Sequence, residues 1–97
     1  MTALLRWHEG KDPSDVWDFS LDATDAMAKV GDTLASASVT ATPTGLTIGT
    51  TAVTEAGVAT VRLSGGTAGT DYAVTFALTT TGGRLLERSV YLLVRNL

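Results

Sequence analysis

The sequence of 97 residues predicts an all-β protein, an immunoglobulin-like antiparallel β-sandwich of roughly six to eight short strands with an N-terminal arm. Three observations predict this class. Apolar and polar residues alternate over several short stretches, turn residues recur about every 8–12 residues, and Thr is the commonest residue. Because the branched side chains of Thr and Val pack well on a pleated sheet, the composition favours strands. A β-barrel is the structural alternative.

The chain has the length of one domain, since single domains typically hold about 50–250 residues. Residues 1–10 are predicted to form the arm and residues 11–97 the sandwich. The arm contains Leu4, Leu5 and Trp7 without a clean period. Such an arm either packs as an edge strand of its own domain or inserts into a neighbouring molecule. Because aromatic anchors often carry interface energy, we expect Leu4, Leu5 and Trp7 to bind a partner.

The first strand of the sandwich is expected over residues 15–23, where apolar residues alternate with Asp and Ser. Trp17, Phe19 and Leu21 share one face of this strand, because side chains two residues apart point the same way. The pattern therefore predicts that all three lie in the core.

Residues 24–32 combine helix-forming residues with Thr24, a candidate N-cap. Because so short a segment does not form a stable helix alone, a single helical turn or a connecting loop is expected, closed at Gly31. A strand is predicted over residues 33–42, which alternate strictly. Its inner face consists of small residues that leave room for bulky ones opposite: Ala35, Ala37, Val39 and Ala41.

The second half of the chain predicts further short strands, at residues 46–48, 51–54 and 58–63, and a loop at residues 64–70. The two longest strands follow, and paired glycines after Thr81 join them as a hairpin. The apolar sets at period two in these strands are the predicted core: Ala59, Val61, Leu63, Tyr72, Val74, Phe76, Leu78, Val90, Leu92 and Val94.

The composition excludes several classes of function. The 7 Lys and Arg residues against 10 Asp and Glu residues give a net charge of −3, without the basic clusters of a nucleic-acid surface. Without cysteine, the chain has no disulfide and no thiolate zinc site. The apolar start of the chain is short and interrupted by Arg6, which argues against a membrane span. We therefore expect neither nucleic acid nor membrane as a partner.

Catalytic signals are scarce. His8 is the only imidazole and lies in the arm, where no rigid scaffold holds it beside a nucleophile. The loop at residues 64–70 lacks the Lys of a phosphate-binding loop. We therefore expect no enzyme activity, no small-molecule substrate and no cofactor.

Two groups of charged residues have alternative interpretations. The acidic group lacks the spacing of a calcium-binding loop, so solvated edge charges are preferred over a metal site: Asp12, Asp15, Asp18, Asp22 and Asp25. For the second group, cross-strand charge pairs are preferred over a binding site for an acidic partner. Its members are Arg84, Glu87, Arg88 and Arg95.

Several motifs together suggest a family. Lys11-Asp12-Pro13 opens the pattern, the stretch Leu63–Tyr72 (LSGGTAGTDY) continues it, and residues 83–89 (GRLLERS) follow near its end. In this order and spacing, the motifs resemble the phage fibre-tail adaptors, small immunoglobulin-like virion proteins of tailed phages. The resemblance spans Lys11 to Arg95 and leaves the arm outside it.

The resemblance implies a non-enzymatic structural protein of the phage tail, present in multiple copies and made in the bacterial host cytoplasm. It would join the tail to fibres or appendages through contacts with tail or connector proteins and with the tail fibre. A head-tail or tail-tip component with the same sandwich stays open. The alternative function is a surface carbohydrate- or receptor-binding module. That module would need an exposed aromatic platform from the two Trp, Tyr72 or Tyr91, and Tyr72 is predicted to face inward.

Overall fold

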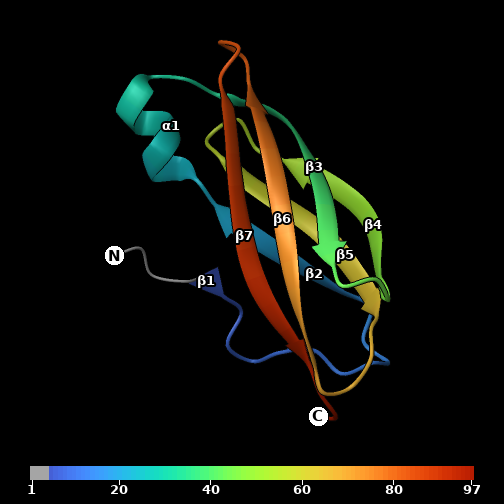
Figure 1. Cartoon of the computed structure of the whole chain (residues 1–97). Coiled ribbons are helices and arrows are strands. Elements are labelled where there is room, and N and C mark those ends of the chain that lie inside the picture. Colours follow the sequence, from blue (N-terminus) through green and yellow to red (C-terminus); the bar gives the residue numbers. More distant parts are fainter. Residues whose placement is uncertain (1–4) are drawn as a thin grey trace.

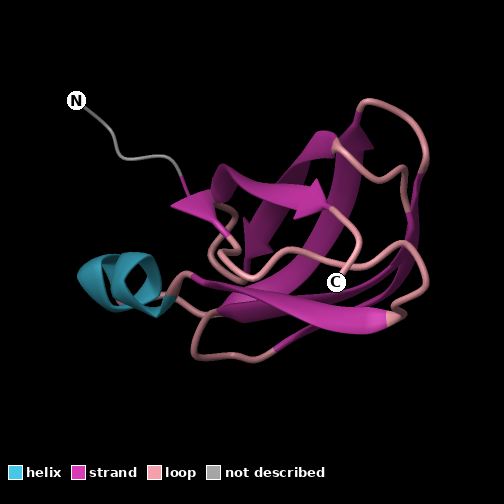
Figure 2. Cartoon of the chain, turned by 90° about the horizontal axis from the view of Figure 1, so that it is seen from below, coloured by secondary structure: helices cyan, strands magenta, loops and turns pink. Residues whose placement is uncertain are grey.

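The computed structural model describes residues 5–97, which form a sandwich of two β-sheets with one short helix (Figure 1). One sheet has the strand order β1-β7-β6-β3 and the other the order β2-β5-β4. Figure 2 shows the two layers of strands from one end, with the helix standing to one side. The elements are β1 (Leu5–Arg6), β2 (Trp17–Asp22), α1 (Thr24–Val30), β3 (Leu34–Thr42), β4 (Leu46–Val53), β5 (Val58–Gly65), β6 (Thr70–Thr80) and β7 (Leu85–Val94). The all-β, two-sheet prediction is confirmed.

The core lies between the sheets and is centred on β6. Tyr72, Val74, Phe76 and Leu78 alternate along this strand, and each is at most 1% exposed. The predicted inner residues of the neighbouring strands are also buried: Ala59, Val61, Leu63, Val90, Leu92 and Val94. Burial of one large apolar side chain contributes about 1.5–3 kcal/mol, so these alternating sets hold the two sheets together.

The β6–β7 hairpin forms as predicted. Its strands pair antiparallel from Thr70 opposite Val94 to Thr79 opposite Leu85. Gly83 in the turn has a φ of 86°, a conformation that favours glycine over residues with a Cβ atom.

The structure corrects the prediction for Trp17. Its cross-strand partner Leu63 is fully buried, but the Trp17 side chain is 69% exposed. Trp17 is the first residue of β2, and β2 is the outer strand of its sheet. The side chain therefore projects past the end of the core instead of filling it.

Residues 24–30 form a helix longer than the predicted single turn. Met27 is buried and anchors α1, because a short helix depends on packing for its stability. Thr24 does not cap the helix: Ala23 holds the N-cap position, and the Asp22 carboxylate accepts hydrogen bonds from the Thr24 N–H and hydroxyl. Gly31 closes the C-terminus in the left-handed conformation, as expected.

Two strands are irregular where the sequence predicted regular ones. The register of β3 shifts between Leu34 and Ser36, which leaves Ala35 exposed and buries Leu34 instead. The segments predicted as two strands, 46–48 and 51–54, are one strand, β4, with a register shift after Ile48. A Cβ atom at Gly49 would lie 3.0 Å from the carbonyl oxygen of Arg62, so glycine permits this close approach.

Lys11 closes one end of the sandwich. Its side chain is only 1% exposed, and its ammonium donates hydrogen bonds to the carbonyl oxygens of Asp12 (2.8 Å) and Gly65 (2.7 Å). Burial lowers the pKa of Lys11. A buried charge is costly without such partners, so Lys11 fixes the loop between β5 and β6.

Asp32 fixes the opposite end. Its side chain is 6% exposed and lies 2.9 Å from the Arg84 guanidinium. Hydrogen bonds from the Thr80 hydroxyl, the Thr33 N–H and Arg84 hold the pKa of Asp32 well below its usual range. The Gly82 N–H also donates to this carboxylate, which thereby joins the β6–β7 turn to the start of β3.

We predict that Asp32→Asn lowers the melting temperature by several degrees at pH 7, because the charged acceptor is lost. The folded carboxyl has a lowered pKa, so it stabilises the fold above the unfolded pKa of about 3.9. That stabilisation is lost as the pH falls below about 4, through the folded pKa. Thermal melts between pH 7 and pH 2 should show a smaller acid-induced loss in the variant than in the wild type. Parallel losses would contradict the role of Asp32.

Candidate interaction surfaces

The described part of the arm is the edge strand of its own domain. Leu5 and Arg6 form β1, which pairs parallel with Val90 and Tyr91 of β7. The Trp7 N–H continues the ladder by donating to the Tyr91 carbonyl oxygen (3.0 Å). The sequence left two alternatives for the arm, packing on its own domain or insertion into a neighbour, and residues 5–7 pack on their own domain.

Arg6 fixes the position of β1 across β7. Its guanidinium donates two hydrogen bonds to the Asp71 carboxylate, at 2.9 and 2.7 Å, and lies over the ring of Tyr91. The hydrogen bonds from Arg6 lower the pKa of Asp71. Because the pair is open to solvent, it orients the strand more than it stabilises the fold.

Trp7 joins the two sheets on this side of the sandwich. Its indole N–H donates to the Ser20 carbonyl oxygen on β2 (3.0 Å). The ring centre lies 5.0 Å from that of Phe19 and 6.1 Å from that of Phe76. The half-buried indole therefore has a structural role within the domain. Partner binding by Leu5 and Trp7 stays a prediction, and Leu4 lies outside the described residues.

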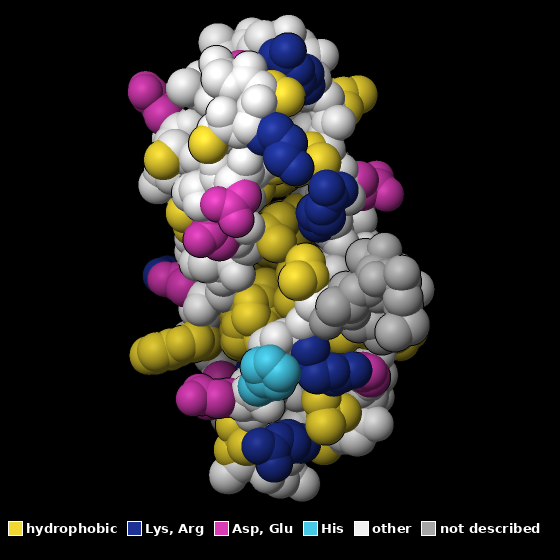
Figure 3. Space-filling view, turned by 90° about the vertical axis from the view of Figure 1, so that its left-hand side faces the viewer, with side chains coloured by type: hydrophobic (Ala, Val, Ile, Leu, Met, Phe, Trp, Pro, Cys, Tyr) yellow, Lys and Arg dark blue, Asp and Glu magenta, His cyan; other side chains and the backbone are white. Residues whose placement is uncertain are grey.

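The most exposed aromatic side chain in the described part of the chain belongs to Trp17. Val16 and Leu97 are also exposed, by 61% and 65%. A hollow next to Leu97 is lined by Trp17, and a groove of about 390 Å³ separates Trp17 from Trp7. We call Val16, Trp17 and Leu97 the Trp17 surface. Figure 3, which faces the side where β1 lies, shows a band of hydrophobic side chains between charged groups.

The acidic residues of this region have local partners. Asp18 on β2 forms a cross-strand ion pair with Arg62 on β5 (2.9 Å), and the hydrogen bond from Arg62 lowers the pKa of Asp18. The Asp12 carboxylate accepts hydrogen bonds from the N–H groups of Ser14 and Leu97. Within residues 5–97, no cluster of three or more His, Cys, Asp or Glu side chains is arranged to hold a metal ion.

The charged residues near the end of the chain pair differently from the expected cross-strand pattern. Arg84 forms its ion pair with Asp32, outside the β6–β7 ladder. Arg88 donates instead to the carbonyl oxygen of Glu87 next to it. The Arg95 side chain donates to the carbonyl oxygen of Glu9 and so helps to hold the turn after β1.

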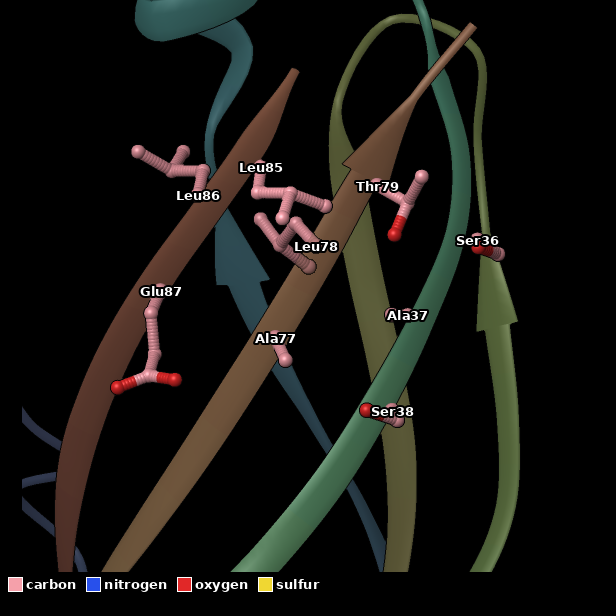
Figure 4. A pocket seen from close by; sticks show the side chains of 9 residues that line it. All are labelled: Ser36, Ala37, Ser38, Ala77, Leu78, Thr79, Leu85, Leu86 and Glu87. Carbon is pink, nitrogen blue, oxygen red and sulfur yellow. The ribbon is translucent and has the colours of Figure 1, made fainter. Parts of the chain in front are cut away.

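A second hollow lies on the outer face of the four-stranded sheet, near the β6–β7 turn (Figure 4). It has a volume of about 340 Å³ and combines small hydroxyl-bearing residues with one carboxylate. Leu85 lines it and is 81% exposed. We call the group Ser36, Thr79, Leu85 and Glu87 the hairpin surface. Its residues suit contact with another protein more than chemistry.

The described residues that could take part in catalysis are not brought together. His8 is exposed on the turn after β1, and no hydrogen bond joins it to a Ser or Thr within residues 5–97. Tyr72 is buried, and its hydroxyl oxygen accepts a hydrogen bond from the Thr67 N–H (2.9 Å). The helix α1 is far too short to span a membrane, and it is the one helix of the described chain.

Comparison with protein families identifies this sandwich. Residues 11–93 match the family described as podophage GP4 fiber-tail adaptor protein gp77. The chain belongs to this family. The match confirms the resemblance drawn from the motifs, and it identifies a phage fibre-tail adaptor. A search among curated proteins found no match.

The adaptor family match includes the Trp17 and hairpin surfaces except for Leu97, and it excludes β1 and Trp7. The sequence alone did not indicate either surface as a candidate site. Alternation places Trp17 on the inward side of its strand, and it carries no sign that the strand begins beyond the core. The one sequence signal that the Leu85 side chain is exposed is its position directly after the hairpin turn and Arg84.

The two tryptophans should differ in their effect on stability. We expect Trp7→Ala to lower the free energy of unfolding by about 2–4 kcal/mol, because it opens a cavity beside Phe19 and removes the hydrogen bond to Ser20. Trp17→Ala should change it by at most about 0.5 kcal/mol, since the side chain is mostly exposed. Urea unfolding followed by circular dichroism measures both without relying on tryptophan fluorescence. Equal losses for the two variants would contradict this assignment.

Proposed function

We propose that this adaptor is a non-enzymatic structural protein of the virion that joins the phage tail to its fibres through protein–protein contacts. The family match over residues 11–93 carries this proposal. The exposed apolar groups support it, because they offer contact surfaces without catalytic chemistry. The protein would be made in the host cytoplasm and then assembled in multiple copies.

The positions of the two surfaces suit a bridging protein. Leu85 begins β7 and Leu97 follows its end, so the hairpin surface and the Trp17 surface lie at opposite ends of this strand (Figure 1). A strand of this length spans about 30 Å at roughly 3.3 Å per residue. One protein can therefore contact each end without the two partners meeting.

The arm provides a third proposed contact. Leu5 on β1 is 43% exposed, while Trp7 beside it is engaged with Phe19 and Ser20. Leu5 can therefore contact a neighbour without loosening the fold. Several copies bound side by side would strengthen the assembly through avidity.

We predict that Trp17→Glu and Leu85→Glu each weaken binding to a different partner. The experiment measures binding of the purified chain to the tail proteins and the fibre protein of its phage. Each substitution should weaken one interaction at least tenfold, since buried apolar anchors commonly dominate an interface. The other interaction should stay unchanged.

Val30→Glu is the matched control, because Val30 is 46% exposed on α1 and belongs to neither surface. Melting temperatures of all three variants establish that each is folded. Binding of both partners by both surface variants at wild-type strength would overturn these two surfaces as the bridging sites.

The exposed indole of Trp17 favours one second function, recognition of a carbohydrate or receptor. Tyr72 is buried and Tyr91 lies under Arg6, so within residues 5–97 Trp17 is the main exposed aromatic ring. Glycan-array binding that Trp17→Ala removes, together with no binding to tail or fibre proteins, would support recognition and contradict the adaptor role.

A further inference from the structure

The two strands on one side of the sandwich contain no charged residue. From Thr33 to Thr54 the sequence contains no Asp, Glu, Lys or Arg. This stretch forms β3 and β4, the last strands of the two sheets, which lie side by side (Figure 1). All the charged residues that give the net charge of −3 lie elsewhere in the chain.

The outer edge of β3 is regular and unprotected. Within residues 5–97 the strand pairs with β6 alone, and from Ser36 to Thr42 its register has no shift. Sheet edges of monomeric proteins are usually protected by a charge, a proline or a bulge, because unpaired peptide groups attract another strand. The segment from Ser36 to Thr42 contains none of these.

Other edges of the molecule are protected. On β2, Asp18 and Asp22 carry charge, and the Ser20 carbonyl oxygen already accepts a hydrogen bond from the Trp7 indole. On β4, the register shift after Ile48 interrupts the edge. On β7, the strand β1 covers part of the edge. The regular, uncharged edge of β3 therefore stands apart from the rest.

The sequence of this edge is symmetric in side-chain type. Residues 36–42 read Ser-Ala-Ser-Val-Thr-Ala-Thr, so hydroxyl and apolar residues follow in the same order from either end, with Val39 at the centre. Ser36, Ser38, Thr40 and Thr42 are exposed, while Ala37, Val39 and Ala41 are half-buried on the inner side.

We propose that β3 pairs antiparallel with β3 of a second copy of this chain, about a two-fold axis at Val39. In this register Ala37 lies opposite Ala41 of the second copy, and Ser38 opposite Thr40. A two-fold contact requires one surface to complement itself, and this symmetric segment does so at every position. Cross-strand pairs of Ser and Thr are favourable, and β4 brings no like charges together when the copies meet.

This contact joins copies of the chain to each other and so goes beyond the proposed link between tail and fibre. A single pair of strands buries little surface, which makes the isolated dimer weak and dependent on concentration. When several copies are held on one assembly, the same contact becomes effective through high local concentration.

The test is sedimentation equilibrium of the full chain over a range of concentrations, with no other protein present. The wild type should show a reversible monomer–dimer equilibrium. Thr40→Lys should weaken the dimer at least about tenfold, because the two introduced ammonium groups lie diagonally across the pair. Ser38→Glu should weaken it similarly through two carboxylates. Both positions are exposed, so melting temperatures should stay near that of the wild type.

An equal mixture of the two variants tests the register itself. In a mixed dimer the introduced ammonium of one variant lies opposite the introduced carboxylate of the other, so dimer formation should return. Ser89→Lys is the matched control, since Ser89 is exposed on β7, two strands away from β3, and this change should leave the dimer intact.

A wild type that stays monomeric up to its solubility limit would overturn the proposal, as would a mixture that does not recover. Dimerisation of Thr40→Lys at wild-type strength would do the same. Because no tail or fibre protein is present, none of these results bears on the bridging function. The binding measurements with the Trp17 and Leu85 variants decide that function separately.

Discussion

The open side between the two sheets is the constraint on which much of this structure depends. On that side β1 and β2 end their sheets, and Trp7 spans them with a hydrogen bond to Ser20 and ring contacts to Phe19 and Phe76. A small domain buries a limited share of its surface, so an uncovered seam beside the core would be costly. The described part of the arm, residues 5–10, thus completes the core and leaves its outer side chains, such as Leu5, for contact with other molecules.

At both ends of the sandwich, charged side chains hold the loops through hydrogen bonds within the domain. Lys11 donates to two carbonyl oxygens at one end, and Asp32 gathers Arg84 and backbone N–H groups at the other. These buried or enclosed charges keep the loops in place, which positions Trp17 and Leu85 on rigid supports. A rigid support suits a bridging protein, because less conformational freedom is lost when a partner binds.

Strand pattern alone was sufficient for most of the fold. Strict alternation predicted the buried side chains of β5, β6 and β7, because one face of each strand packs against the opposite sheet while the other faces outward. It was wrong for Trp17, since alternation shows which side a residue faces and gives no information on where the opposite sheet ends. Bulges such as the one after Leu34 escaped prediction for a related reason: they depend on how β3 meets β6. The resemblance to the adaptor family came from the motifs, and the proposed contact surfaces became visible only in the fold.

Charged residues are distributed unevenly over the edges of the two sheets. Charged residues protect β2 and β1 covers part of β7, while the segment from Thr33 to Thr54 is left uncharged along β3 and β4. A monomer gains nothing from an unprotected regular edge, which exposes it to unwanted strand pairing. In the proposed assembly of several copies, such an edge has a use, because it lets neighbouring copies pair with each other. The uncharged strands thus suit the proposed contact between copies, and the exposed apolar residues at the two ends suit the proposed contacts with tail and fibre.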